Sequence, residues 1–237
     1  MIFYVCTSAY AGFPFLTDDP APVEYQHYEM NAGIQQTRTT DGTSGTLPFI
    51  ELNYGVTSDV QLHISAPLES NLVTFGPRQY GYGDTELGVK YRIAQETPEL
   101  PMIAIYPTIE LPTGNPNKGL GNGKTQLFLP IWFEKNWDTW QSNIGGGYWI
   151  NNAAATMKDH WFTGWQLQKD MSERLTLGAE IFYSTEQTVG QGNNSGFNIG
   201  GNYNFDAQNH LLFSIGKGIS NVAVDKSMFY LGYQRNW

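Results

Sequence analysis

Histidine and cysteine are the residue types best suited to metal binding, and this chain has few of either. The four histidines are His27, His63, His160 and His210, and none belongs to an H-E-x-x-H pair. Cys6 is the only cysteine, so no set of cysteines and histidines has the spacing of zinc ligands. The sequence therefore predicts neither a metal site nor a cofactor.

A serine and a histidine offer the arrangement best suited to nucleophilic catalysis. Ser65 follows His63 by two residues, which places both side chains on the same face of a strand. A hydrolase would also need a third, orienting group, and the G-x-S-x-G turn is missing. The glycine-rich residues 114–125 do not form a phosphate loop, because Lys118 stands where that motif needs glycine. We expect no enzymatic activity and keep the hydrolase as an alternative.

Charged residues recur on one side of strongly alternating segments. In residues 85–93, for example, apolar side chains alternate with Glu86, Gly88, Lys90 and Arg92. Successive side chains of a strand point to opposite faces, so one face of such a segment is apolar and the other polar. The residues that this parity assigns to the polar face include Glu51, His63, Glu86, Lys90, Arg92, Glu110, Phe128, Trp132, Glu134 and Glu180.

These ten residues would line the lumen of a membrane barrel, since charged side chains are costly against lipid. Facing acidic and basic groups would then create a field that orients a polar solute. The alternative is a salt-bridged, water-filled or plugged interior that only holds the barrel together. Six tryptophans in the middle third favour either an interfacial belt or an aromatic path inside the barrel. They are Trp132, Trp137, Trp140, Trp149, Trp161 and Trp165.

About twelve alternating segments are arranged along the chain. They begin near Tyr25, Leu47, Val60, Thr85, Met102, Thr125, Thr139, His160, Leu175, Gly196, His210 and Met228. Short connections, such as residues 56–59, alternate with longer ones, such as residues 37–46, 69–83, 112–124 and 186–195, a pattern typical of outer-membrane barrels. Such strands need only about 9–11 residues each. We predict an all-β fold, a single antiparallel up-and-down transmembrane barrel over residues 12–237, with a soluble β-sandwich as the alternative.

The two ends of the chain support export to a membrane. Phe229, Leu231, Tyr233 and Trp237 share one parity, and this ending resembles the sorting signal that the barrel-assembly machinery of bacteria reads. Residues 1–11 read as a signal-peptide remnant, in which A-Y-A at residues 9–11 is the cleavage site. The net charge of -9 argues against nucleic acid as a partner. The expected partners are outer-membrane lipid, the assembly machinery and a small solute.

Two stretches carry a resemblance to a known family. They are P-F-L-T-D-D-P at residues 14–20, and L-P-T-G-N-P at residues 111–116 continued by G-L-G-N-G. Both resemble a family of outer-membrane proteins named for the MetA pathway of phenol degradation, often labelled transporters. The resemblance implies a barrel in the bacterial outer membrane that takes up hydrophobic or aromatic compounds, and it supplies no catalytic residues.

The expected function is therefore an outer-membrane channel for passive uptake of small molecules, among them hydrophobic or aromatic ones. Two alternatives stay open. One is an outer-membrane hydrolase or lipid-modifying enzyme, and the other is a structural barrel with a blocked lumen.

Overall fold

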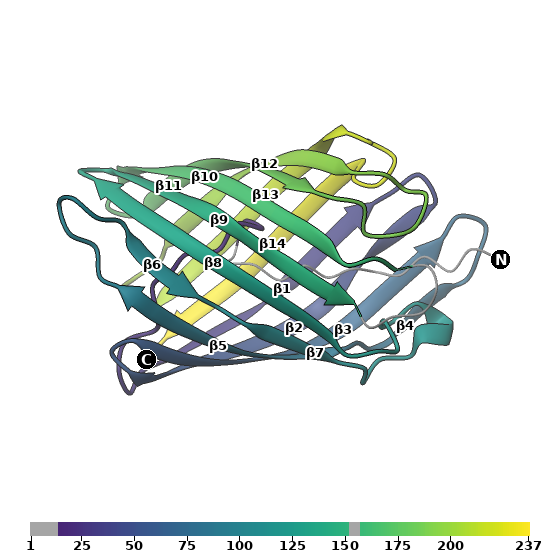
Figure 1. Cartoon of the computed structure of the whole chain (residues 1–237), viewed down its shortest axis with the longest axis horizontal. Coiled ribbons are helices and arrows are strands. Elements are labelled where there is room, and N and C mark those ends of the chain that lie inside the picture. The colour runs from purple at the N-terminus through teal and green to yellow at the C-terminus, as the bar shows by residue number, and fades with distance from the viewer. Residues whose placement is uncertain (1–13, 152–156) are drawn as a thin grey trace.

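The computed structural model describes residues 14–151 and 157–237, which form a barrel (Figure 1). The predicted signal remnant lies outside the described residues. Within them, the strand segments are β1 (Tyr28–Arg38), β2 (Gly42–Thr57), β3 (Val60–Val73), β4 (Arg78–Tyr82), β5 (Thr85–Ala94), β6 (Met102–Ile105), β7 (Thr108–Leu111), β8 (Gln126–Trp137), β9 (Trp140–Asn151), β10 (His160–Ser172), β11 (Leu175–Ser184), β12 (Asn194–Asn204), β13 (Asn209–Ser220) and β14 (Ser227–Asn236). A short 3-10 helix, η1 (Pro116–Lys118), lies between β7 and β8.

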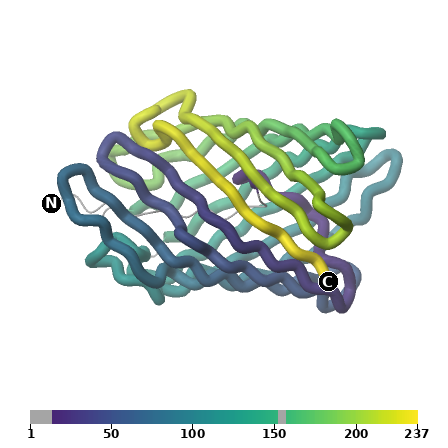
Figure 2. Tube along the Cα trace, turned by 180° about the vertical axis from the view of Figure 1, so that it is seen from behind, coloured from purple at the N-terminus to yellow at the C-terminus, as the bar shows by residue number. Residues whose placement is uncertain are grey.

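The barrel closes between its first and last strands. β1 pairs with β14 in antiparallel register, from Glu29 opposite Asn236 to Arg38 opposite Ser227. Figure 2 shows these two strands side by side, purple against yellow. All other paired strands are antiparallel too. Closure satisfies the backbone groups of what would otherwise be two open edges, as a lipid environment requires.

Two of the barrel strands are each made of two segments. β4 and β5 lie end to end along β3, with a break at Gly83 and Asp84. β6 and β7 lie end to end between β5 and β8, with a break at Tyr106 and Pro107. Proline has no N–H to donate to a ladder, so Pro107 interrupts the pairing. Counting each pair of segments once gives the twelve-stranded barrel that the alternation predicts.

Two connections predicted to be long are short instead. Residues 37–46 belong mostly to β1 and β2, and residues 69–83 belong mostly to the β3–β4 hairpin. Residues 37–46 are rich in Thr and Gly, and residues 69–83 contain Gly, Pro, Ser and Asn, which are residue types typical of loops and turns. They form strands because neighbouring strands pair with their backbone groups, as Gly42 does with Val73.

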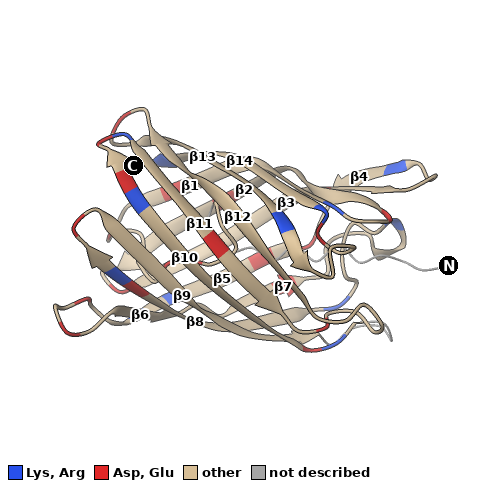
Figure 3. Cartoon of the chain, turned by 90° about the horizontal axis from the view of Figure 1, so that it is seen from above, with Lys and Arg blue, Asp and Glu red and all other residues tan. Residues whose placement is uncertain are grey.

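The outer face of the barrel is strongly apolar. Ile50, Leu62, Ile144 and Ile181 point outward and are 53%, 47%, 52% and 52% exposed. Figure 3 shows charged residues gathered toward the two ends of the barrel, with few along the middle of the strands. An apolar band of this kind suits contact with lipid. Among the described residues, no helix has both the length and the apolar character needed to cross a membrane.

The tryptophans of the middle third divide between the two faces. Four are exposed on the outside, where a belt at the membrane interface is expected, and two are buried inside. The outer four are Trp137, Trp140, Trp161 and Trp165, and the inner two are Trp132 and Trp149.

Candidate functional site

Much of the segment that precedes β1 lies inside the barrel, and its last residues, 24–27, are exposed (Figure 1). We call residues 14–27 the N-terminal segment. Its backbone is bonded to inward-facing side chains of several strands: the Ser214 hydroxyl donates to the carbonyl of Pro14 over 2.6 Å, and Gln61 Oε1 accepts from Val23 N–H over 2.8 Å. The tip of the segment is buried, with Phe15 at 3% and Thr17 at 1% exposure. The lumen is therefore partly filled by the chain itself.

Glu180 on β11 holds the tip of this segment. Its carboxylate accepts hydrogen bonds from the backbone N–H groups of Leu16 and Thr17, each over 2.8 Å. It also accepts from the Thr17 hydroxyl over 2.8 Å and from Asn198 Nδ2 over 2.6 Å. Gly164 makes room for this contact, because a Cβ there would lie 2.1 Å from Thr17 Oγ1. Three of these four donors belong to the N-terminal segment, so one buried carboxylate fixes the segment at this point.

Lys90 on β5 forms the second attachment. Its Nζ lies 3.2 Å from Asp18 Oδ1 and 3.5 Å from Asp19 Oδ1, and 5.0 Å from the centre of the Tyr106 ring. Lys90 and Asp18 are both buried. The double aspartate of the P-F-L-T-D-D-P motif is thus the partner of a lysine in the wall.

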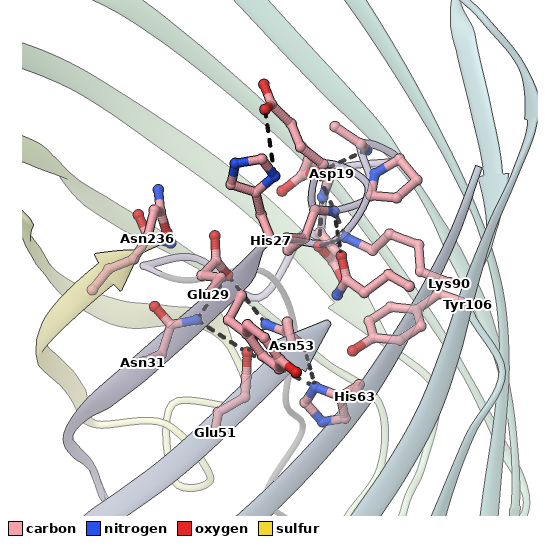
Figure 4. Close-up of a pocket in the computed structure, with 18 of the residues that line it drawn as sticks. Asp19, His27, Glu29, Asn31, Glu51, Asn53, His63, Lys90, Tyr106 and Asn236 are labelled. Atoms are coloured by element: carbon pink, nitrogen blue, oxygen red, sulfur yellow. Dashed lines mark hydrogen bonds and ion pairs between the residues drawn. The ribbon is translucent and has the colours of Figure 1, made fainter. Parts of the chain in front are cut away.

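His63 lies in a polar network on the wall beside Lys90 (Figure 4). Its Nδ1 is 2.9 Å from Asn53 Oδ1, and its Nε2 is 3.0 Å from Glu86 Oε1. Asn53 in turn donates through Nδ2 to Glu29 and Glu51. Both ring nitrogens therefore face Asn53 and Glu86 rather than Ser65, so the structure does not show the Ser–His arrangement of a hydrolase. Among the described residues, no group of three or more His, Cys, Asp or Glu side chains could hold a metal ion.

A cavity of about 660 Å³ opens between the N-terminal segment and the wall. It lies at the end of the barrel where Tyr28 and Trp237 exchange backbone hydrogen bonds, and we call it the terminal cavity. Figure 4 shows its lining side chains converging from the segment and the strands. Its acidic lining residues are Asp18, Asp19, Glu24, Glu29, Glu51, Glu86 and Glu134.

A second cavity, of about 340 Å³, lies at the opposite end of the lumen. Its lining is largely hydroxyl and amide side chains, including Thr37, Ser44, Asn71 and Gln187. We call it the loop cavity, because the loops after β11 and β13 contribute to it. The lumen thus contains two polar cavities, and the terminal cavity has more charged side chains in its lining than the loop cavity.

Aromatic side chains form a buried cluster on the inner wall. Phe128 stacks on Trp149 with ring centres 4.6 Å apart, and Phe162 lies 6.5 Å from Trp132. Leu16 of the N-terminal segment packs against this cluster. We call it the aromatic cluster, and its buried members are Tyr106, Phe128, Trp132, Trp149, Phe162 and Phe182.

The loop between β7 and β8 folds inward at the loop end. Leu120 is 2% exposed, and Asn122 donates through Nδ2 to Glu110 over 3.2 Å. Asp84, at the break between β4 and β5, accepts from the backbone N–H groups of Gly114 and Asn122 over 2.8 and 2.6 Å. The glycine-rich motif therefore forms a loop fastened to the inner wall.

The structure places nearly all of the predicted pore-lining residues in the interior. Arg92 faces inward but lies at the terminal end, where its guanidinium donates to Asp59 over 2.9 and 2.8 Å. The hydrogen bonds from Arg92 and Ser58 hold the pKa of Asp59 below its usual value. The other nine are buried on the inner face: Glu51, His63, Glu86, Lys90, Glu110, Phe128, Trp132, Glu134 and Glu180.

Sequence reasoning missed the partners of these residues. Asp18 and Asp19 precede the first strand, so no parity assigned them to the lumen. Asn53 and Tyr106 do lie on inward parities, and the parity of β2 could have identified Asn53 as the neighbour of Glu51. Trp149 and Phe162 were also missed as interior aromatics.

The residues of the predicted sorting signal lie on the outside of β14 or just after it. Their exposed fractions are 39% for Phe229, 39% for Leu231, 37% for Tyr233 and 44% for Trp237. Their role in assembly stays a prediction.

In fold, the barrel is similar to known outer-membrane channels and porins. An outer membrane channel from Pseudomonas putida F1 matches with a TM-score of 0.75 and 15% identity, over 92% of this chain and 98% of that chain. The KdgM porin matches with a TM-score of 0.60 and 11% identity, over 86% of this chain and 98% of that chain. The NanC porin matches with a TM-score of 0.59 and 7% identity, over 88% of this chain and 98% of that chain. No curated protein matches the chain in sequence.

A family model does match the sequence. Its description is "Putative MetA-pathway of phenol degradation", and the match covers residues 24–232, which is almost the whole barrel. The match includes the second motif, at residues 111–116, whereas the first, at residues 14–20, lies outside it. The predicted family is therefore confirmed, and the chain belongs to it.

Proposed function

We propose that this protein is a channel of the bacterial outer membrane that lets small molecules pass through its lumen by diffusion. One observation carries the proposal. A closed barrel with an apolar exterior holds two polar cavities at opposite ends, and the tip of the N-terminal segment lies in the interior between them. The similar folds of channels and porins support the same role.

The proposed solutes are small molecules that include hydrophobic or aromatic ones. The aromatic cluster supports this, because Leu16 covers part of it in the structure. Movement of the N-terminal segment would expose aromatic rings between the two cavities and provide an apolar surface for a ring-shaped solute. The description of the family, which names phenol degradation, agrees with this solute class.

The proposed channel is closed or narrow in this structure. Passage requires the N-terminal segment to move, since its tip is held by Glu180 and Lys90 in the interior of the barrel. The same contacts favour the second candidate, a structural barrel whose lumen stays blocked. The two candidates differ only in whether the segment moves.

Recordings in planar bilayers and liposome swelling with phenol separate the two candidates. A channel gives discrete current steps and faster swelling than protein-free liposomes. A barrel that is folded by heat-modifiable migration on gels, yet conducts no ions and admits no solute, is a structural barrel.

The inward-folded loop should narrow the lumen at the loop end. Asp84→Ala removes the acceptor of two backbone N–H groups, so residues 114–122 should become mobile and the current should become larger and noisier. Asn117→Ala changes an exposed residue of the same loop and serves as the control. Single-channel traces of Asp84→Ala that match those of the wild type would show that this loop does not limit the current.

A further inference from the structure

We propose that the terminal cavity binds small organic ammonium ions. The proposal names a class of solute for the channel. Transport of that solute rests on the proposed function. Binding to the cavity does not depend on conduction, so the two can fail separately.

The terminal cavity carries an excess of negative charge. Seven carboxylates line it, against one lysine, which already pairs with Asp18 and Asp19, and two histidines, His27 and His63, which lie beside other carboxylates of the lining. Within the described chain, Glu29 and Glu134 form no ion pair with a basic side chain; they accept hydrogen bonds from neutral amides such as that of Asn136. Amide donors leave the charge uncompensated, and a confined, partly dehydrated cavity strengthens its attraction for a cation.

A row of hydrogen-bond acceptors lies on one wall of this cavity. In the register of the sheet, Glu134 of β8 stands opposite Asn143 of β9, and Asn143 stands opposite Gln166 of β10. All three side chains line the cavity and are at most 4% exposed. One carboxylate oxygen of Glu134 and the amide oxygens of Asn143 and Gln166 accept no hydrogen bond from any described residue.

Such buried acceptors are costly to leave unpaired, which indicates a ligand that donates hydrogen bonds. An ammonium group has three N–H donors and no acceptor, so it complements one carboxylate and two amide oxygens. Its positive charge also complements the net negative charge of the lining. A neutral hydroxyl group has a single O–H donor and no positive charge, and a carboxylate has neither a donor nor a positive charge.

The test compares three compounds that differ mainly in the polar group: benzylammonium, benzyl alcohol and benzoate. Each is titrated by calorimetry into the full-length protein, refolded in detergent and checked by heat-modifiable migration. We expect benzylammonium to bind and the other two compounds to give no heat of binding. Glu134→Gln keeps the size of the side chain but removes its charge, so the dissociation constant should rise about tenfold or more. Asn143→Leu removes a neutral acceptor and should weaken binding as well.

Glu173→Gln is the matched control, because Glu173 is exposed in the β10–β11 turn and does not line the cavity. Its affinity for benzylammonium should equal that of the wild type. The proposal is overturned if folded wild-type protein does not bind benzylammonium, or if Glu134→Gln binds it as tightly. Equal competition by potassium chloride at the same concentration would show general attraction of cations rather than this site. Absence of conductance alone would reject the channel and leave the binding site standing.

Discussion

Replacing Glu180 with alanine should free the N-terminal segment and greatly raise the fraction of time that the channel is open. The change leaves two backbone N–H groups and one hydroxyl of residues 16–17 without their acceptor. If the loss favours the displaced segment by about 3 kcal/mol, the displaced population rises about a hundredfold. The barrel itself should persist, since its ladders do not involve this side chain.

The measurement is open probability in single-channel recordings, together with swelling rates in liposomes. Thr17→Val removes only the hydroxyl donor and should give a smaller increase in open probability. Glu173→Ala, an exposed glutamate in the turn before β11, is the control and should behave like the wild type. If Glu180→Ala folds normally and its currents equal those of the wild type, the segment does not close the lumen.

Replacing Trp237 with aspartate should sharply lower the amount of protein that reaches the outer membrane. Trp237 exchanges backbone hydrogen bonds with Tyr28 over 2.8 and 3.0 Å, and its ring stacks on that of Tyr28 with centres 5.7 Å apart. These contacts lie at the seam where β14 meets β1, so the last residue contributes to closure. A carboxylate at an outward-facing position near the membrane is also unfavourable.

Quantitative blots of outer-membrane and periplasmic fractions measure this effect. Trp237→Phe keeps an aromatic ring at the end of the chain and should restore most of the outer-membrane protein. Ile219→Asp also puts a carboxylate at an outward position, on β13. This control separates the general cost of a charge on the outer face from a specific role of Trp237 in assembly. Equal losses in Trp237→Asp and Ile219→Asp would argue against a special role for the last residue.

The inner and outer faces of the barrel could be predicted from the sequence alone. Parity assigned Glu51, His63, Glu86 and Lys90 to the interior, and the structure buries them there. The period of two is a local property of an extended backbone, so a short window of sequence is enough to reveal it. The fold class and the approximate number of strands followed from the same signal.

The connections at the loop end were harder to predict. Polar, glycine-rich residues such as those at 37–46 resemble a loop in composition, yet they pair as strands. The pairing depends on the neighbouring strands, which a short window of sequence does not show.

Only the tertiary structure decided that the lumen is occupied and by what. Glu180 contacts Thr17 across 163 residues of sequence, and Lys90 contacts Asp18 across 72. The sequence determined that both Glu180 and Lys90 point inward, because alternation fixes the face of the strand on which each side chain lies. It did not determine their partners, because residues 14–20 carry no alternation and the lumen that they occupy is formed by all the strands together.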